Sequence, residues 1–238
     1  MILNIANGKE LQAYLTNKCD VDEDIMAFNE SMVTGESNEK IFSDAFFHVR
    51  AKSLNINYEE YSAISIMELD KLLNKSYAKV ILWFDEDMFC QINLLTLCAY
   101  LDYSKYGGIV LLNIIRKDFW QYDKLDNIVI KSYNINLSGY YSIYQDILIN
   151  KVFTRNDYLV FEELREGIKL YKNYTSGNSE IRSAIRAMIK DKKSKEDIIK
   201  VIIEAYPQYG IGDYNIKLLY QLEKDVIDGY NPGSHPQY

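Results

Sequence analysis

The stretch AKVILWFDEDMFCQINLLTLCAYL, residues 78–101, decides the fold. Residues 78–84 are an almost continuous apolar run, which predicts a strand buried on both faces of a sheet. Residues 89–103 carry apolar side chains at helical spacing and predict a helix. Three consecutive acids lie between the two elements. The stretch therefore predicts a buried strand, an acidic turn and a helix in direct succession.

Strand and helix signals alternate on both sides of this stretch. Because strands alternating with helices form right-handed crossovers, the order predicts an α/β domain with a mostly parallel sheet covered by helices on both faces. This is a Rossmann-like or flavodoxin-like three-layer architecture, although the G-x-G-x-x-G fingerprint of dinucleotide binding is missing after the first strand. The expected strands are residues 1–6, 24–28, 78–84, 107–114 and 127–133, with the last at the edge, and the expected helices are 9–18, 39–54, 58–73 and 89–103.

No strand signal appears after residue 135, so the remainder predicts an all-helical region. We therefore expect an α/β parallel-sheet domain at residues 1–135 and a helical C-terminal domain at residues 136–238. Asn178 and Ser194 are expected helix N-caps, because their side chains can accept from backbone N–H groups of the first turn. The expected helices are residues 140–150, 156–172, 179–190, 195–206 and 213–228.

The composition is that of a globular protein, with 48% hydrophobic and 26% charged residues. The formal net charge of −7 disfavours nucleic acid as a partner, because phosphate recognition needs a basic surface. The sequence has neither a signal-peptide pattern nor an apolar stretch of about 20 residues, so we expect a cytoplasmic location and no membrane contact. Three cysteines without a CxxC pair argue against a disulfide framework and a structural zinc site.

Ligands of open α/β sheets bind outside the carboxyl ends of the strands, and this rule selects the candidate residues. Each of the first four strands ends in polar side chains, so one edge of the sheet is expected to be polar. The residues at these ends are Asn7 and Gly8, then Asn29 and Glu30, then Asp85 and Asp87 after Trp83, and finally Asn113.

Each candidate at the third strand also has a structural interpretation. Asp85 or Asp87 can cap the following helix, where the helix dipole favours a carboxylate, or can act as a metal ligand or general base together with Glu30. Gln91 can bind a ligand or cap the same helix. Trp83 can stack on a ligand or belong to the core.

Two further candidates lie outside that turn. Asn7-Gly8 is either a tight turn or a place where the backbone approaches a ligand at the start of a helix. Arg50 belongs to an expected helix, where a surface ion pair is the ordinary interpretation and contact with an anionic ligand the alternative.

Short motifs along the chain resemble the bacterial family called domain of unknown function 1835. The matching points are the Asn7-Gly8 turn, the Gly-containing segment 28–35, Trp83 followed by the acidic segment, and Gln91. The stretch AYPQYGIGDYNIKLL near the C-terminus resembles a helical segment that often follows the domain. Lys9 and Asn29 depart from the pattern, because acids are common in the family at both places. The resemblance implies the same α/β domain with a helical extension, and it implies no substrate.

Two functions remain open at this point beside a purely structural role, and we expect the first of them. The first is the binding of a small-molecule or nucleotide-related ligand, with or without catalysis, at the carboxyl edge of the sheet. The second is a regulatory or protein-interaction module that uses the C-terminal helices. The sequence does not decide whether the protein is an enzyme, and it assigns no cofactor, metal, catalytic residue or oligomeric state. The candidate ligand-binding residues are Asn7, Gly8, Asn29, Glu30, Arg50, Trp83, Asp85, Asp87 and Gln91.

Overall fold

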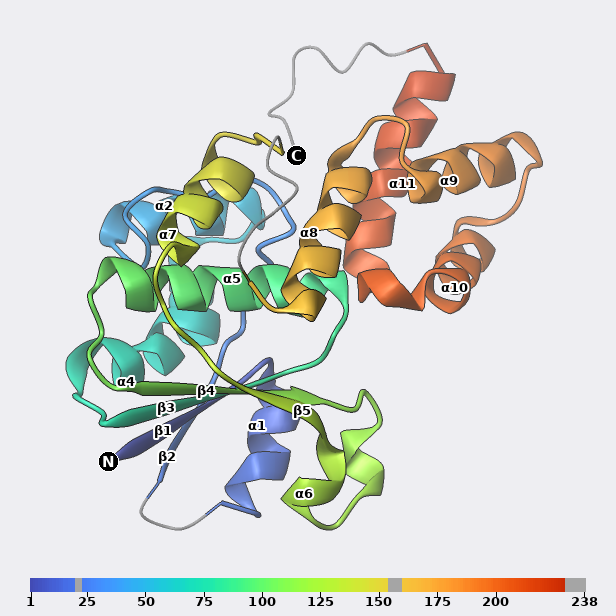
Figure 1. The fold of residues 1–238 in the computed structure, drawn as a ribbon. Coiled ribbons are helices and arrows are strands. Elements are labelled where there is room, and N and C mark those ends of the chain that lie inside the picture. Colours follow the sequence, from blue (N-terminus) through green and yellow to red (C-terminus); the bar gives the residue numbers. More distant parts are fainter. Residues whose placement is uncertain (20–22, 154–159, 230–238) are drawn as a thin grey trace.

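A five-stranded sheet forms the centre of the fold (Figure 1). The computed structural model describes residues 1–19, 23–153 and 160–229. The strands lie in the order β2-β1-β3-β4-β5, and every neighbouring pair is parallel except β4 and β5. The predicted α/β fold is confirmed, with the last strand at the edge. The strands are β1 (Ile2–Ala6), β2 (Asp24–Ala27), β3 (Lys79–Phe84), β4 (Ile109–Ile115) and β5 (Val129–Asn134).

The parallel strands are in step at their carboxyl ends. Ala6 of β1 pairs with Ala27 of β2 and with Trp83 of β3, and Trp83 pairs in turn with Asn113 of β4. Segments that follow these strands therefore leave the sheet along one edge, as the strand-end rule requires.

Helices cover both faces of the sheet (Figure 1). The helices α1 (Lys9–Thr16) and α6 (Leu125–Ile128) lie on one face, and the larger helical layer lies on the other. The smaller layer has its own apolar cluster, which consists of Ala6, Leu11, Leu15, Ile81, Trp83, Ile115 and Ile128.

The central helix of the larger layer is α5 (Met88–Tyr103), and twelve of its sixteen residues are buried. It is covered by the sheet on one side and by α7 (Tyr140–Tyr144) and α8 (Glu162–Thr175) on the other. A helix that is apolar nearly all round is stable only when packed on all sides, which explains the long apolar run in the sequence.

The helix expected from residue 39 begins later. The first helix after β2 is α2 (Asp44–Ser53), whose N-cap Ser43 accepts a hydrogen bond from the Phe46 backbone N–H. Phe42 has a φ of 58°, a left-handed conformation that a helix cannot contain. This residue, together with the Ser43 cap, ends the loop and sets the start of α2.

The helix expected at residues 58–73 is interrupted by a change of pitch. α3 (Tyr58–Tyr61) continues through a π-helical turn, Ser62–Ile66, into α4 (Met67–Asn74). A π-helical turn adds a residue to the repeat and rotates the following side chains. This rotation explains why the apolar spacing of the segment is irregular.

The C-terminal part is helical, as expected. After α8 come α9 (Glu180–Lys190), α10 (Lys195–Ala205), a 3₁₀ turn at Pro207–Tyr209 and α11 (Asp213–Ile227). The start of the helix expected at 156–172 lies partly outside the described residues, and α8 begins at Glu162. Ser194 is an N-cap as predicted, but the cap of α9 is Ser179 rather than Asn178, because the Ser179 hydroxyl accepts from the Arg182 N–H.

The helical part and the sheet share one apolar core. A single cluster of buried side chains includes Phe84 and Leu95 from the first part and Tyr171, Ile202 and Leu219 from the second. α7 and α8 both pack on α5. The division at residue 135 stays a prediction, and the helices that follow it complete the covering of α5.

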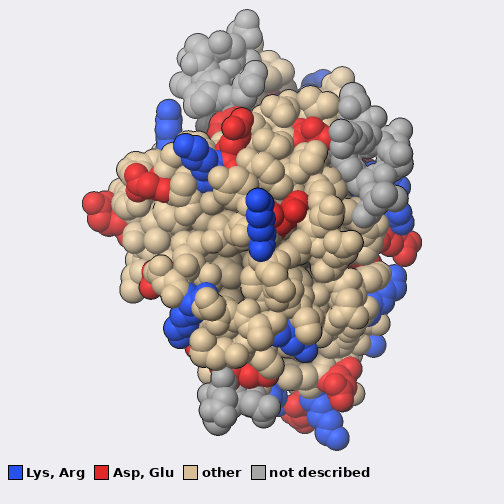
Figure 2. Space-filling model, turned by 60° about the vertical axis from the view of Figure 1, so that its left-hand side comes forward, with Lys and Arg blue, Asp and Glu red and all other residues tan. Residues whose placement is uncertain are grey.

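The surface carries charges of both signs. On the face that Figure 2 shows, Lys and Arg side chains alternate with Asp and Glu side chains, and no large patch of one sign is present. Among the described residues, no helix has both the length and the apolar character that crossing a membrane requires.

Candidate functional site

The turn between β3 and α5 carries the two acids that the sequence singled out. Asp87 is the N-cap of α5, and its Oδ1 accepts from the Cys90 N–H at 2.8 Å. Asp85 Oδ1 accepts from the Asp87 N–H at 2.9 Å. The capping interpretation is therefore confirmed for Asp87.

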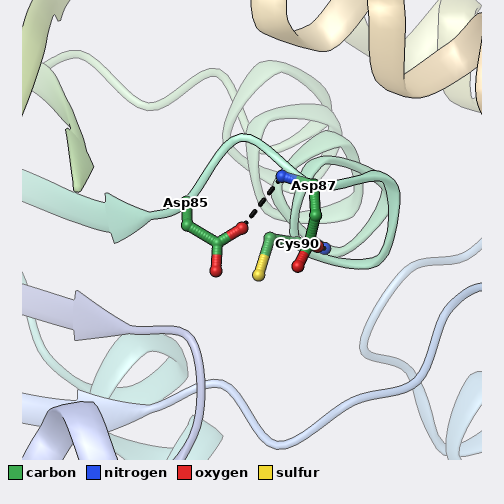
Figure 3. Close-up of side chains that lie close together, drawn as sticks. All are labelled: Asp85, Asp87 and Cys90. Carbon is green, nitrogen blue, oxygen red and sulfur yellow. Dashed lines mark hydrogen bonds between the residues drawn. The ribbon is translucent and has the colours of Figure 1, made fainter. Parts of the chain in front are cut away.

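Cys90 lies with these two acids. The Asp85 and Asp87 carboxylates and the Cys90 thiol offer ligand atoms that all lie within 4.8 Å of one another, and the three side chains point toward the same space (Figure 3). Two carboxylates and a thiol are donors that zinc accepts. The positive charge at this cluster comes from Lys117, whose Nζ lies 3.1 Å from Asp87 Oδ2.

Burial and mutual repulsion shift the ionisation of this cluster. Burial, and then the charge of Asp87, raise the pKa of the Asp85 carboxyl to about 7. Burial likewise raises the pKa of the Cys90 thiol well above its usual range, so the thiol is protonated at neutral pH. Burial lowers the pKa of Lys117, but Asp87 and Asp85 outweigh it and the net shift is upward. A carboxyl with a pKa near 7 can both donate and accept a proton.

Asn7 and Gly8 border a small cavity beside this cluster. The cavity holds about 210 Å³ and lies between the start of α1 and the Asp85 turn. Gly8, with a φ of 98°, is the N-cap residue of α1, and no side chain caps this helix. The first backbone N–H groups of α1 are thus left for another acceptor. The residues that line the cavity are Asn7, Gly8, Lys9, Glu10, Leu11, Asp85, Cys90, Ile115 and Phe119.

A second, larger cavity of about 540 Å³ opens on the other side of the turn. Glu86, Asp87 and Lys117 form its wall at the strand ends, while α8 and the 3₁₀ turn close the opposite side. The helical part therefore borders the carboxyl edge of the sheet. The lining residues are Glu86, Asp87, Lys117, Lys131, Glu162, Glu163, Glu166, Leu170, Pro207 and Gln208.

The C-terminal segment touches Asp87 directly. Lys117 Nζ donates to the Pro207 carbonyl at 2.8 Å and at the same time pairs with Asp87. Gly210 approaches so closely that a Cβ added there would lie 2.1 Å from the Asp87 carboxylate. The turn after β3 is thus held between the sheet and the helical part.

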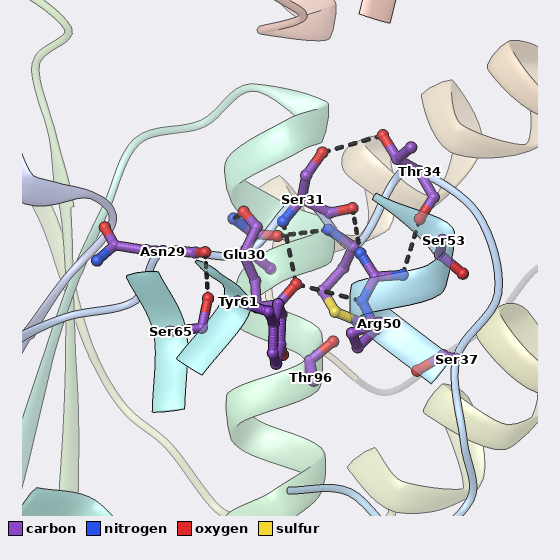
Figure 4. A network of polar contacts seen from close by, with 12 residues as sticks. Asn29, Glu30, Ser31, Thr34, Ser37, Arg50, Ser53, Tyr61, Ser65 and Thr96 are labelled. Atoms are coloured by element: carbon purple, nitrogen blue, oxygen red, sulfur yellow. Dashed lines mark hydrogen bonds and ion pairs between the residues drawn. The ribbon is translucent and has the colours of Figure 1, made fainter. Parts of the chain in front are cut away.

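Glu30 and Arg50 form a buried ion pair away from Asp85 and Asp87 (Figure 4). Arg50 Nε donates to Glu30 Oε2 at 3.2 Å, and the Tyr61 hydroxyl donates to Glu30 Oε1. Both charged side chains are fully buried, so the expected surface ion pair of Arg50 was wrong in its location. Glu30 is fully engaged in this network, and its carboxylate is paired with Arg50 rather than with the acidic turn.

The remaining candidates have structural partners. The Asn29 side chain donates to the Ile64 carbonyl, and Trp83 packs in the smaller apolar cluster and donates to Asn4 Oδ1 at 2.9 Å. Gln91 is completely buried, and its Nε2 donates to the Asp85 carbonyl at 2.6 Å. Its Oε1 accepts no hydrogen bond from the described residues. Of the predicted set, the structure brings Asn7, Gly8, Asp85, Asp87 and Gln91 together.

Sequence reasoning missed Cys90, Asn93 and Lys117. Cys90 follows the acids in the spacing Asp-x-Asp-x-x-Cys, which puts it one turn into a capped helix and beside the cap. Lys117 follows β4, but placing the strand end near Asn113 instead of Ile115 excluded it from the strand-end residues. Asn93 of α5 donates to Asn7 Oδ1, and it had no signal in the sequence because an amide within an apolar helix becomes informative only through its partners.

No protein-family model matches the chain, and no curated protein matches it. The resemblance to domain of unknown function 1835 stays a prediction.

Proposed function

We propose that this protein binds a small polar ligand, such as a nucleotide-related molecule, at the carboxyl edge of its sheet. The observation that carries the proposal is the position of the Asp85–Asp87 turn between two cavities. Asp85 borders the smaller one beside Asn7 and Gly8, and Asp87 borders the larger one beside Lys117. Concave sites with a few converging polar groups at this edge are where α/β proteins bind ligands.

The same site has the means for proton transfer. Asp85 is half-buried, and desolvation together with the charge of Asp87 raises the pKa of its carboxyl to about 7, so it exists in both protonation states near neutral pH. A group poised in this way is suited to general acid–base catalysis on a bound molecule. We therefore include a catalytic role of Asp85 in the proposal. This role requires that a ligand binds at the site.

The test is a thermal-shift screen of the full chain against nucleotides, sugar phosphates and divalent metal ions. A ligand at a hundredfold excess over its Kd stabilises the native state by about 2.7 kcal/mol. We expect at least one compound to raise the Tm of the wild type, and we expect Asp85→Asn or Asp87→Asn to abolish that rise. Asparagine is used at position 87 because it preserves the helix cap.

Asp126→Asn is the matched control. Asp126 lies at the start of α6, is exposed and borders neither cavity, and its substitution changes the net charge by the same amount. A shift that survives in both site variants would place the ligand elsewhere. No shift with any compound class would count against ligand binding.

A second candidate function is a regulatory or protein-interaction module, and the surface of the last two long helices favours it. Val201 and Ile203 of α10 and Tyr214, Val226 and Ile227 of α11 are each more than a third exposed. Lys192 and Lys193, between α9 and α10, are exposed. Val201→Glu together with Ile203→Glu should abolish partner capture in pull-downs without lowering Tm, if this surface binds a protein.

A further inference from the structure

Asn93 of α5 links the buried network around Glu30 to the smaller cavity. Its side chain is completely buried and makes three hydrogen bonds. Asn93 Oδ1 accepts from the Met32 backbone N–H at 3.0 Å. Asn93 Nδ2 donates to the Glu30 carbonyl at 2.7 Å and to Asn7 Oδ1 at 3.0 Å.

The orientation of the Asn93 amide is determined by the backbone. A backbone N–H can only donate and a backbone carbonyl can only accept. Met32 therefore requires the oxygen of Asn93 on its side, and Glu30 requires the nitrogen on the other. If the amide were turned over, its NH₂ group would face the Met32 N–H and its oxygen would face the Glu30 carbonyl. Neither pair can form a hydrogen bond, and unpaired polar groups are costly in the protein interior.

The orientation of Asn7 follows from that of Asn93. Since Asn93 presents a donor, the atom of Asn7 that faces it has to be the oxygen. The Asn7 nitrogen then points the other way, where it lies 2.7 Å from Cys90 Sγ. An asparagine without such a partner can turn either its oxygen or its nitrogen toward the cavity. Asn7 alone therefore does not decide whether the cavity contains a hydrogen-bond acceptor or a donor.

The geometry points to Asn93 as the positioning residue of the candidate site: it holds Asn7 with its amide nitrogen toward Cys90 and the smaller cavity. This inference deepens the proposed ligand site. A primary amide has two N–H donors, and one of them suffices for the Cys90 sulfur. The other gives the cavity a fixed hydrogen-bond donor, which suits an acceptor atom of the ligand.

The hydrogen bonds of Arg50 fix the loop after β2, which contacts Asn93. Arg50 donates to the carbonyls of Ser31, Thr34 and Glu36 and pairs with the Glu30 side chain. These bonds hold the loop that supplies both backbone partners of Asn93, the Glu30 carbonyl and the Met32 N–H. Preorganised groups bind without an ordering cost at the moment of binding.

The test uses nuclear Overhauser effects on the full chain labelled with ¹⁵N at asparagine, and it needs no ligand, so its outcome is independent of the ligand screen. In the wild type we expect cross-peaks between the Asn7 side-chain NH₂ and the Cys90 β-protons. Asn93→Leu is nearly isosteric and removes the donor to Asn7 without leaving room for water. We expect it to reduce these cross-peaks at least twofold, because the amide is no longer held in one orientation.

Thr96→Val is the matched control, since Thr96 is equally buried one turn along α5 and its hydroxyl donates to the Ile92 carbonyl of the same helix. It should leave the Asn7 cross-peaks unchanged. A purely structural role of Asn93 would lower stability and leave the cross-peaks in place, and that result would overturn the inference. Should the Asn93→Leu variant fail to fold, the wild-type spectrum still decides, because missing cross-peaks to Cys90 refute the orientation of Asn7.

Discussion

The guanidinium of Arg50 lies in the protein interior, against one carboxylate and three backbone carbonyls. A buried charge is tolerated when it is paired and hydrogen-bonded, and Arg50 is paired with Glu30 and bonded to the three carbonyls. Four of its five N–H donors have acceptors in this network, so the side chain works as a cross-link between α2 and the loop after β2. At the scale of single residues, such pairing explains which polar groups are structural and which are available to a ligand.

Replacing Arg50 should be severely destabilising. Arg50→Met leaves the Glu30 carboxylate buried without its cation, and breaking a buried pair in this way costs about 3–5 kcal/mol. Urea unfolding followed by circular dichroism measures the loss. Arg165→Met is the control, because Arg165 is exposed on α8 and its replacement should change the free energy of unfolding by no more than about 0.5 kcal/mol. Equal effects of the two substitutions would contradict the role of the pair.

Asp85 should make stability depend on pH. Its folded pKa of about 7 is above its usual value of 3.8, so between about pH 4 and 7 the native state binds a proton that the unfolded state lacks. Stability from this group is complete below about pH 4 and is lost as the pH rises through 7. Urea midpoints of the wild type should fall across this window relative to Asp85→Asn, in which no proton is exchanged. Parallel pH profiles of the two proteins would argue against the raised pKa.

At the scale of elements, the short segment between α10 and α11 packs against the turn between β3 and α5. Its 3₁₀ turn ends at Gly210, which has a φ of 62° and lies against the Asp87 carboxylate. Tyr209 anchors the segment, since its hydroxyl donates to Glu180 Oε1 at 2.5 Å and lies 2.9 Å from Asn173 Oδ1. The segment thus has a fixed position on the cap of α5.

Gly210→Ser should destabilise the protein by at least about 1 kcal/mol. The left-handed backbone disfavours any side chain, and the new Cβ would overlap the Asp87 carboxylate. Gly212→Ser adds the same side chain two residues on, where φ is −88° and the space is open, and serine is a favoured N-cap for α11. Gly212→Ser should therefore be neutral or slightly stabilising in the same denaturation experiment. If both variants lose stability equally, the close approach at Gly210 is not what matters.

At the scale of the whole molecule, the apolar helix α5 has to be covered by other elements on all sides. The sheet covers one side of this apolar helix, and α7 and α8 cover the other. These two helices come after residue 135, so the predicted α/β domain depends on helices from the predicted C-terminal domain. Both parts of the chain contribute to one core and to the walls of the larger cavity.

A fragment of residues 1–135 should therefore not fold alone. Without α7 and α8 one side of α5 is left open to water, and large exposed apolar surfaces lead to aggregation. Circular dichroism and size-exclusion chromatography of the fragment should show an aggregated or non-cooperative species, whereas the full chain should unfold cooperatively. A soluble fragment with a sigmoidal urea transition would instead favour an independent domain.

The sequence by itself determined the sheet, most of the helices and the edge at which to look for a site. These features are local: an apolar run such as 79–84 specifies a buried strand, and parallel strands put their carboxyl ends, and so Asn7, Gly8, Asp85 and Asp87, on one edge. The sequence did not fix where helices start. The start of α2 depends on the backbone angle of Phe42, and the start of α9 depends on one hydrogen bond to the Ser179 hydroxyl.

Tertiary structure alone decided the partners of the polar side chains. Glu30 bonds Arg50 twenty positions away, Cys90 contacts Asn7 across 83 positions, and Lys117 joins Asp87 to the Pro207 carbonyl. Such pairs form where helices and loops pack over the sheet, and this packing is set by the summed burial of the whole core. An acidic residue has the same sequence signal whether its carboxylate faces a lysine, a guanidinium or open space. The ionisation and hydrogen bonding of each acid therefore follow from its neighbours in the folded structure.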